Sequence, residues 1–356
     1  EFLMEHGPST VNAQSIDAND IAKRLELTAE QCALGAGVKN RYLVGKGALK
    51  GIPVHPLGFL WSNYLSLKGR LRLMTEFAVP RNKNKAEETI AEFAGRRFGK
   101  EFAAKVIDPL VAGIYAGRAG ELSVKAGFPK LYGLEQKYGS ISLGLIQHHR
   151  QGAKNMPSSR LFSFKDGIGS LPKALADALG ERVKTGVNVR RIKKTLHGFS
   201  IDTEDKSKLR ARAIVVATQP HVAAELLEDV DVYSSHTASE IEAPPLAVVY
   251  FGFKRKDVEH PLDGLGFLAP ESEKLSMSGS QFCSTMFPGR APQDCVSMAG
   301  YFGGARAPEL AQLPAADLTE IARREFKDLV GAKGEPVVSR VRHWPRGLPQ
   351  YKIGHT

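Results

Sequence analysis

The stretch Asp108-Pro-Leu-Val-Ala-Gly-Ile-Tyr-Ala-Gly117 decides how this chain folds. Upstream of it, apolar residues recur every four positions and therefore share one face of a helix: Phe102, Val106 and Leu110. Pro109 lacks an amide hydrogen and disfavours helical geometry in the residue before it, which predicts a bend or an end of the helix. Gly113 and Gly117 have no Cβ, so another backbone or a ligand can approach them closely. Two glycines at this spacing are also typical of tight helix packing, and the local residues leave both interpretations open.

Further helical patterns surround this stretch. Asn84 and Glu87 have the spacing of a capping box, with Asn at the N-cap and Glu at the third helical position. The helix that follows has an apolar face and is expected to end near Gly99; that face carries Ile90, Phe93 and Ala94. Residues from about 41 to 147 are therefore expected to form a largely helical insertion.

The rest of the chain alternates strands with helices. Predicted strands cover residues 187–192, 198–203, 213–218, 246–253 and 296–302. Predicted helices cover residues 17–25, 169–180 and 317–331. Residues 42–49 are expected to form a hairpin with Gly45 and Gly47 in its turn. Interleaved strands and helices favour an α/β fold with an added helical domain.

Composition limits the class of protein. At 356 residues the chain exceeds one ordinary core, which favours two or three domains. Its 42% hydrophobic and 24% charged residues are typical of a soluble globular protein, and it has no run of 18 apolar residues that would span a membrane. The cysteines, Cys32, Cys283 and Cys295, lack metal-ligand spacing and are typical of reduced thiols in an intracellular protein.

The net charge of +11 is spread over several basic clusters. Most such clusters are solvated faces, and an anionic membrane surface is the functional alternative. No helix-turn-helix, zinc finger or aromatic-rich basic groove is present in the sequence, so nucleic acid is not an expected partner.

Segments along the whole chain resemble the family of oxygen-dependent, FAD-containing protoporphyrinogen oxidases, within the flavin amine oxidase superfamily. In order, they are Glu5-His-Gly-Pro-Ser-Thr10, Asn40-Arg-Tyr-Leu-Val44, residues 108–140, Leu161-Phe-Ser-Phe-Lys-Asp-Gly167, Pro261-Leu-Asp-Gly-Leu-Gly-Phe-Leu268, Phe287-Pro-Gly-Arg-Ala-Pro292, Tyr301-Phe-Gly-Gly-Ala-Arg306 and residues 344–351. The resemblance implies an α/β (α+β) fold, that of a two-dinucleotide-binding-domain flavoprotein with a mixed-sheet substrate domain and an inserted helical domain.

The resemblance also implies domain limits. Residues 1–32, 173–221 and 344–356 would belong to the FAD-binding domain. Residues 33–147 would form the mainly helical, membrane-associated insertion. Residues 148–172 and 222–343 would form the substrate-binding domain.

A Gly-rich turn for a dinucleotide pyrophosphate is expected in such a fold. The nearest match, Leu34-Gly-Ala-Gly-Val38, lacks a preceding strand and is better interpreted as a loop after a helix. By resemblance, the FAD motif would lie upstream of the first residue and a closing segment downstream of the last. We therefore expect the chain to be a fragment that would not hold FAD well by itself.

Site residues follow from the same resemblance. Those placed against FAD are Gly7, Pro8, Ser9 and Thr10, with Val189 contacting the adenine through its backbone and Ala217 and Thr218 passing near the cofactor. Arg41 would bind a carboxylate of the tetrapyrrole, as the guanidinium fork allows. The residues expected to form an apolar slot for the macrocycle are Gly113, Leu268, Phe287 and Tyr301. Residues 280–283 depart from the family's usual apolar residues, which leaves one wall of the slot undefined. No catalytic side chain and no metal site is expected.

The activity implied is oxidation of protoporphyrinogen IX to protoporphyrin IX, with FAD as cofactor and molecular oxygen as acceptor. Coproporphyrinogen III is the alternative substrate, and a flavin-less binder of tetrapyrrole or membrane is the alternative from another class. An amine oxidase is less favoured because Arg41 suits an anion. The protein is expected to be cytoplasmic and attached peripherally to a membrane surface; its oligomeric state, a homodimer included, stays open.

Overall fold

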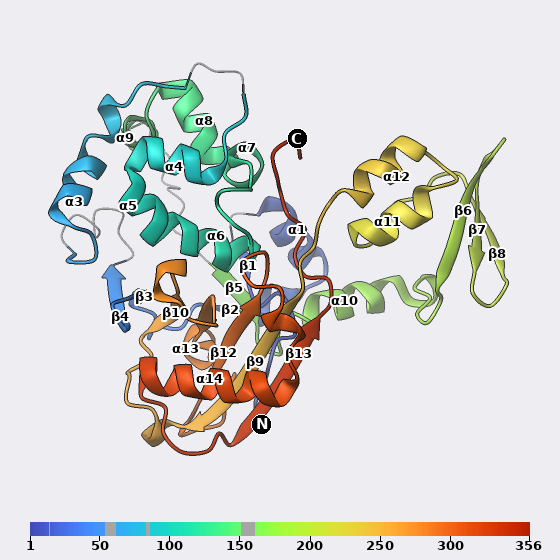
Figure 1. Ribbon diagram of the computed structural model, residues 1–356. Helices are drawn as coiled ribbons and strands as arrows, with labels where there is room; N and C mark the ends of the chain where they lie inside the picture. The colour runs from blue at the N-terminus through green and yellow to red at the C-terminus, as the bar shows by residue number, and fades with distance from the viewer. Residues whose placement is uncertain (14, 54–61, 83–85, 151–160) are drawn as a thin grey trace. The chain divides into compact units, whose positions relative to one another are not determined.

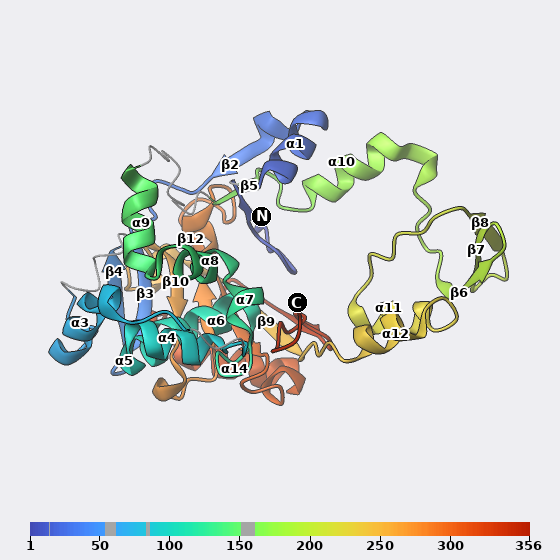
Figure 2. The same cartoon turned by 90° about the horizontal axis from the view of Figure 1, so that it is seen from above.

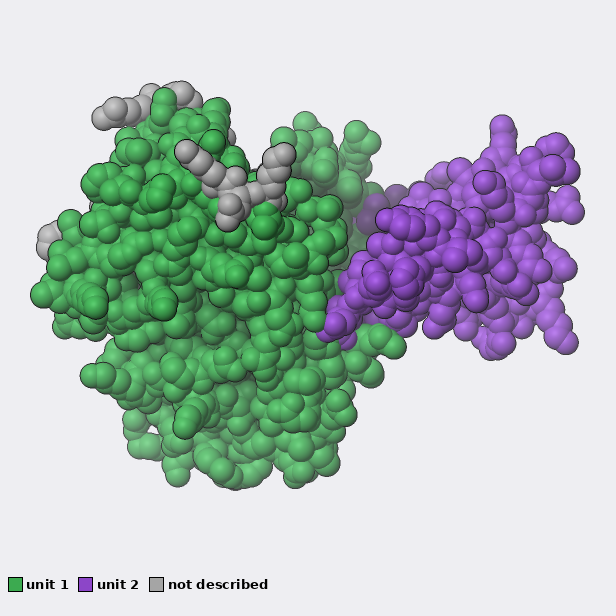
Figure 3. Space-filling model, turned by 45° about the horizontal axis from the view of Figure 1, so that its top comes forward, with its two compact units in different colours: residues 1–172, 244–356 green, residues 173–243 purple. Residues whose placement is uncertain are grey.

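The computed structural model describes the chain except for residues 14, 54–61, 83–85 and 151–160 (Figure 1). The chain forms two compact units, coloured separately in Figure 3. Unit 1 comprises residues 1–172 and 244–356, and unit 2 comprises residues 173–243. The mixture of sheets and helices confirms the predicted α/β (α+β) class.

Unit 1 is built on a sheet in which seven strands of the described residues pair. In spatial order they are β13 (Val338–Trp344), β9 (Leu246–Lys254), β12 (Cys295–Gly303), β11 (Gly279–Gln281), β10 (Gly264–Leu268), β3 (Asn40–Gly45) and β4 (Ala48–Pro53). Every neighbouring pair is antiparallel except β10 and β3, which run parallel. The strands predicted at 246–253 and 296–302 are confirmed as β9 and β12.

Successive residues of a strand point to opposite faces of a sheet, and β9 is apolar on both. Ala247, Val249 and Phe251 face α14 (Ala315–Val330), which covers one side of the sheet (Figure 1). The α14 residues in this core are Leu318, Ala322, Phe326, Leu329 and Val330, and Gly331 ends the helix in a left-handed conformation, as predicted. Val248 and Tyr250 of β9 face the other side, where they pack with Ala299.

The hairpin predicted near residue 45 is formed by β3 and β4. Its turn is Lys46–Gly47, both with positive φ, and Gly45 is the last residue of β3 rather than part of the turn. The hairpin lies at the edge of the sheet, so residues 40–53 belong to the sheet and not to the helical region in which we expected them.

A helical region follows the hairpin. Its elements are α3 (Leu67–Met74), the 3₁₀ turn Glu76–Ala78, α4 (Ile90–Phe98), α5 (Lys100–Phe102), a π-helical segment Ala103–Ile107, α6 (Asp108–Tyr115), α7 (Val124–Gly127), α8 (Pro129–Tyr138) and α9 (Ile141–Arg150). The predicted face of α4 is buried in the core of this region together with Val111 and Leu122.

Two local predictions in the helical region need correction. The capping box of α4 is made by Thr89 and Glu92, not by Asn84 and Glu87; residue 84 lies outside the described residues. Thr89 has the extended backbone that an N-cap needs, and Glu87 instead accepts a hydrogen bond from the amide of Gly354.

Pro109 does not end its helix. It occupies the first turn of α6, where a missing amide hydrogen costs little, and the π-helical segment directly precedes that turn. The chain therefore stays helical from Lys100 to Tyr115 with its hydrogen-bond pattern altered ahead of the proline.

The smaller elements of unit 1 include a second sheet of strands β1 (Val11–Asn12), β5 (Leu161–Phe164) and β2 (Gln31–Ala33). The predicted helix at 17–25 is α1 (Ile16–Arg24), capped by Ser15. Residues 1–10 form no strand. Short helical turns connect the rest; they are Leu27–Glu30, Arg255–Asp257, Glu271–Glu273, α13 (Cys283–Met286) and Leu310–Gln312.

Unit 2 contains a three-stranded antiparallel sheet and two helices. Its elements are β6 (Val189–Thr195), β7 (Gly198–Thr203), β8 (Lys208–Ala211), α11 (Pro220–Leu227) and α12 (Val232–Ser239), preceded by α10 (Ser170–Leu179) and the turn Gly180–Arg182. The strand predicted at 213–218 is wrong. No strand of the described residues pairs with it, and Val215 is 91% exposed, so the apolar run has no sheet to join.

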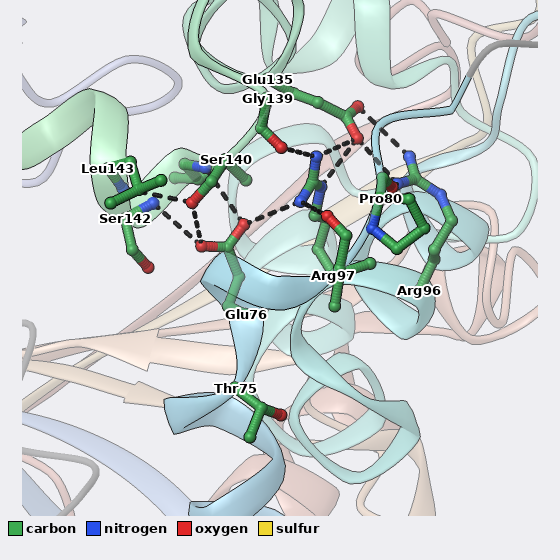
Figure 4. A network of polar contacts seen from close by, with 12 residues as sticks. Thr75, Glu76, Pro80, Arg96, Arg97, Glu135, Gly139, Ser140, Ser142 and Leu143 are labelled. Carbon is green, nitrogen blue, oxygen red and sulfur yellow. Dashed lines mark hydrogen bonds and ion pairs between the residues drawn. The ribbon is translucent and has the colours of Figure 1, made fainter.

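Buried charges organise the helical region (Figure 4). Arg97 of α4 is fully buried and lies beside the buried carboxylates of Glu76 and Glu135. Its Nε donates to Glu135 Oε1 at 2.7 Å, and its Nη2 donates to the carbonyl of Gly139 at 2.6 Å. Arg96 adds a second contact to Glu135, at 2.7 Å. Together these contacts fasten α4 to the end of α8.

Glu76 joins the same network to α9 (Figure 4). Its carboxylate accepts from Ser140 Oγ at 2.8 Å and from the amides of Ile141 and Ser142, both at 3.0 Å, at the start of α9. Burial by itself would raise the pKa of Glu76, but the hydrogen bonds from Ser142, Ser140 and Ile141 hold it below its ordinary value.

Replacing Glu76 by Ala is expected to destabilise unit 1 by roughly 3 kcal/mol, because buried donors and Arg97 lose a partner. Since the folded-state pKa is lowered, the carboxylate stabilises the fold above its unfolded pKa of about 4.3 and loses this effect as pH falls through the folded value. Urea unfolding at pH 7 and pH 4 measures both effects. Glu320→Ala, on the exposed side of α14, is the control; an equal loss in both variants would contradict the role of the network.

Candidate functional site

The face of the sheet opposite α14 carries most of the predicted site residues. Strand register places Val248, Tyr301, Gly279, Leu268 and Leu43 side by side in one row across five strands. A second row contains Tyr250, Ala299, Gln281 and Gly266. Arg41 shares the face of β3 with Leu43 because side chains two residues apart point the same way.

α6 rests on one end of this face. A Cβ on Gly113 would overlap Leu268 Cδ2, so helix and strand come this close only because residue 113 is glycine. Asp108 at the start of α6 pairs with Arg306 at 2.5 Å, and the carbonyl of Ala116 accepts from the amide of Ala305 at 2.7 Å. Gly113 was predicted to allow close approach of another backbone or a ligand. In the structure the group that approaches it is the side chain of Leu268, which supports the interpretation of Gly113 as a packing residue. Gly113 is otherwise exposed.

A small cavity, with room for about one water molecule, lies over the second row. Its lining includes three predicted residues, Ser9, Phe287 and Tyr301, so the structure brings a residue expected against the cofactor next to two expected against the substrate. The other lining residues are Leu3, Glu5, Tyr250, Gln281, Cys283, Met286 and Arg290. Ser9 Oγ donates a hydrogen bond to Gln281 Oε1 at 3.1 Å.

Three titratable groups that line the cavity, two tyrosines and a cysteine, favour their neutral forms. Burial raises the pKa of both tyrosines, Tyr250 and Tyr301, above the ordinary value, and it raises the pKa of the Cys283 thiol to about 12. At neutral pH these three side chains are therefore protonated and carry no charge.

Arg290 and Glu5 are the charged residues of the cavity wall, and they form an ion pair at 3.5 Å. Arg290 is 2% exposed and also donates to the carbonyls of Lys165 and Phe164, both at 3.0 Å. Glu5 accepts from the amide of Ile168 at 2.8 Å. These contacts hold the segment after β5 against the sheet, which joins three sequence segments that the resemblance singled out.

Arg41 lies where β3 meets β10. The ladder shifts register between Gly264 and Phe267, and the bulge lies opposite Arg41. Asp263 fixes the residues on both sides of Arg41, since it accepts from Tyr42 Oη at 2.5 Å and from Asn40 Nδ2 at 3.0 Å. Arg41 is exposed overall, and partial burial of its guanidinium lowers its pKa.

The remaining cofactor residues lie in two places. His6 and Gly7 form an exposed bend ahead of β1, with the exposed Pro8 next to it, and the carbonyl of His6 accepts from Trp344 Nε1 at 2.8 Å. Thr10 follows and is half-buried. Val189 is the first residue of β6 in unit 2, paired with Thr203, and the other two expected near the cofactor, Ala217 and Thr218, lie in the exposed stretch after β8.

Sequence reasoning missed some residues of the site. Gln281 lay in the segment flagged as departing from the family, and that polarity was the available signal. Tyr250 lay hidden in an apolar run, although alternation along β9 would have put it on the face of Ala299 and Tyr301. Arg290 and Asp263 lie in two of the segments quoted for the resemblance, but their roles were missed because their partners are more than 100 residues away in the sequence.

The Leu34–Val38 segment differs from the expectation, because a strand, β2, directly precedes it and not a helix. Gly35 packs against the carbonyl of Thr285, where a Cβ would come within 2.5 Å, and donates its amide to Met286 O, so protein backbone occupies the space beside this turn. Within the described parts of the chain, no cluster of His, Cys, Asp and Glu is arranged to bind a metal, and none of the helices has the length and apolar character to cross a bilayer.

Gly113→Ala is expected to destabilise the fold by about 1–3 kcal/mol through overlap with Leu268. Gly95→Ala is the matched control: this glycine also lies inside a helix, but a Cβ there meets no atom within 4 Å, so alanine should stabilise the fold by about 0.5–1 kcal/mol. Urea unfolding measures both changes. The cost of Gly113→Ala should shrink in a Leu268→Ala background, and an unchanged cost would locate the strain elsewhere.

Comparison with known proteins places the chain in a family. The model for flavin containing amine oxidoreductases matches residues 1–355. A mitochondrial protoporphyrinogen oxidase of Nicotiana tabacum is 29% identical over 395 residues, which cover 99% of this chain and 76% of the tobacco protein. The coproporphyrinogen III oxidase of Bacillus subtilis (strain 168) is 26% identical over 365 residues, covering 99% and 77%.

Solved structures agree on the fold. A protein of Exiguobacterium sp. 255-15, described as a "putative protoporphyrinogen oxidase", superimposes with a TM-score of 0.82 at 19% identity, covering 99% of this chain and 78% of that one. A reduced UDP-galactopyranose mutase superimposes with a TM-score of 0.68 at 14% identity, covering 99% and 75%. The chain therefore shares the fold of these proteins, and it belongs to the family of flavin-containing amine oxidoreductases.

Proposed function

We propose that the chain serves an FAD-dependent oxidation of protoporphyrinogen IX to protoporphyrin IX, with molecular oxygen as acceptor. One observation supports the proposal most strongly: several predicted site residues lie on or beside the same face of the sheet. Leu268, which contacts Gly113, and Tyr301 are on this face, and Phe287 and Ser9 line the cavity beside it. The relatives named protoporphyrinogen oxidase, and the resemblance of eight segments to that family, support the same substrate.

The edge of a flavin ring would lie beside the cavity, whose aromatic and apolar walls carry a few neutral polar groups. Ser9, which follows the exposed residues Gly7 and Pro8, would contact the flavin. When bound, FAD would supply the hydride-accepting chemistry. Residues for the pyrophosphate are not evident among the described ones, because the Gly35 loop is filled by Thr285.

The side chains of the site would act by binding and orientation. The apolar slot, with Leu268 at one end and Phe287 at the other, would exclude water and orient the macrocycle. Arg41 would pair with a carboxylate at the edge of the sheet. We assign no acid or base role, because Tyr250, Tyr301 and Cys283 all favour their protonated forms at neutral pH.

We retain the domain roles as part of the proposal. Residues 1–32, 173–221 and 344–356 would contribute to the FAD-binding domain, 148–172 and 222–343 to the substrate domain, and the helices after residue 53 to a membrane-associated insertion. The compact unit 173–243 extends beyond the proposed limit at 221, since α11 packs beside β6 and α12 in that unit.

Coproporphyrinogen III, with four carboxylates rather than two, is the second candidate substrate, favoured by the Bacillus subtilis relative. Kinetics of the purified protein with both substrates decide between them. A clear preference for coproporphyrinogen would replace the first assignment, and no turnover of either substrate by protein that contains flavin would refute both.

Arg41→Ala is expected to raise KM for the porphyrinogen at least tenfold while the flavin content stays the same, because a charged hydrogen-bond partner of the carboxylate is lost. Arg324→Ala is the matched control, an exposed arginine on α14 at the opposite face of the sheet. An unchanged KM in Arg41→Ala would remove this residue from the site.

We further propose that α3 contacts an anionic membrane surface. Its outward residues Leu67, Leu71 and Met74 are 66%, 56% and 57% exposed, and Phe77 in the next turn is 60% exposed. Their spacing of three to four residues places them on one face of a helix. Lys68 lies beside this face and would attract acidic lipid headgroups.

The double variant Leu71→Glu, Phe77→Glu is expected to lower the affinity for vesicles of anionic lipid at least tenfold, because two apolar side chains no longer enter the interface. Co-sedimentation measures the bound fraction. Leu196→Glu provides the control, since Leu196 is 97% exposed in unit 2 and lies outside α3. Equal vesicle binding by all proteins would contradict the contact.

A further inference from the structure

The parallel ladder between β3 and β10 is interrupted beside Arg41. Asn40 pairs with Gly264 and Tyr42 pairs with Phe267, so β10 advances by three residues where β3 advances by two. A bulge of this kind disrupts the ladder locally and changes the direction of the side chain next to it. On the β10 side, the direction of Arg41 therefore depends on contacts other than the regular ladder.

Asp263 supplies contacts of this kind on both sides of Arg41. Its carboxylate accepts from Tyr42 Oη at 2.5 Å and from Asn40 Nδ2 at 3.0 Å. Its backbone carbonyl accepts from the amides of Lys39 and Asn40, at 3.0 and 3.1 Å. The hydrogen bond from Tyr42 keeps the pKa of Asp263 below its ordinary value, so the carboxylate is ionised at neutral pH and its hydrogen bonds are charge-assisted.

The residues around Asp263 are themselves held in place. Tyr42 is 9% exposed, and the ring of His260 packs edge-on against it with the ring centroids 4.8 Å apart. Nδ1 of His260 accepts from the amide of Leu262 at 3.0 Å. Leu262 directly precedes Asp263 and has a φ of +56°, a left-handed conformation that leucine seldom adopts. Such outliers persist only where the surrounding structure enforces them, and they cluster at functional sites.

Asp263 holds β3 from the side that faces α14. Side chains alternate along a strand, so Asn40 and Tyr42 point to the face opposite Arg41. Tyr42 accordingly belongs to the core beneath α14. The carboxylate of Asp263, which bonds these two side chains, therefore does not meet a ligand on the face of Arg41, and its effect on such a ligand would pass through Arg41.

We propose that Asp263 is a positioning residue, which holds Asn40 and Tyr42 and thereby directs the guanidinium of Arg41 toward a carboxylate of the tetrapyrrole. The inference rests on the proposed function and deepens it. Without the charge of Asp263, the two residues that flank Arg41 lose their common partner, and the ion pair between Arg41 and the ligand weakens. Contacts between the apolar slot and the macrocycle itself stay unchanged.

Fluorescence titration with protoporphyrin IX and with its dimethyl ester tests this inference, because the ester keeps the macrocycle and lacks the charged carboxylates. Asp263→Asn is expected to weaken binding of protoporphyrin IX about three- to tenfold and to leave binding of the ester unchanged. Tyr42→Phe removes one hydroxyl and should act in the same way. Glu325→Gln is the matched control: this carboxylate on α14 also accepts from two groups, the amides of Ser276 and Met277, and its loss should change neither affinity.

A double-mutant cycle connects Asp263 to the guanidinium. If Asp263 acts through Arg41, Asp263→Asn should add nothing to the loss of affinity that Arg41→Ala causes by itself. Equal losses for the acid and the ester, additive losses in the cycle, or unchanged binding of protoporphyrin IX by Asp263→Asn would each overturn the inference. If Asp263→Asn does not fold, Tyr42→Phe decides by the same criteria.

The same titrations separate the two possible failures. If Arg41→Ala weakens binding of protoporphyrin IX and Asp263→Asn does not, only the inference about Asp263 fails. If the unaltered protein binds no porphyrin, or if Arg41→Ala binds it as tightly as the unaltered protein, the role of Arg41 in the proposed function fails, and the inference fails with it.

Discussion

Close contact between α6 and β10 sets the geometry on which the site depends. At Gly113 the helix touches Leu268 with no room for a Cβ, and the Asp108–Arg306 ion pair and the Ala116–Ala305 hydrogen bond fix the same helix to the sheet. A bulkier residue would lift the helix and open the slot between the two layers. This contact also positions the rest of the helical region, because α6 and α4 share one hydrophobic core.

The two faces of the large sheet have different roles: one forms the packed core and the other carries the candidate site. One face is filled by α14 with large apolar side chains, such as Phe251, Phe302 and Phe326, that leave no exposed surface. The opposite face carries small and polar residues at the same strand positions, among them Gly279, Ala299 and Gln281. Because alternation along a strand assigns each residue to one face, the packed core can be fixed without constraining the residues of the slot.

Charge is used differently in the two parts of unit 1. In the helical region, buried Arg97 and its carboxylates form a fully paired network that holds four elements together (Figure 4). In the cavity, the Glu5–Arg290 pair neutralises the wall, and the polar groups left over are neutral. Figure 2 shows the chain from above, with α6 beside β10. This arrangement, with buried charges paired and the slot neutral, would fit the proposed substrate, a macrocycle that is uncharged except for its peripheral carboxylates.

The sequence by itself determined the class of fold and the long elements, because β9, β12, α1 and α14 have clear periodicity and flanking turn residues. It also pointed to Gly113, Leu268, Tyr301, Phe287 and Ser9 through ordered motifs. Only the tertiary structure decided that Ser9 meets Tyr301 and Gln281, that Asp263 fixes the neighbours of Arg41, and that residues 213–218 form no strand. Those outcomes depend on partners distant in the chain, and local propensity carries no information about which distant strand or side chain supplies the hydrogen bond.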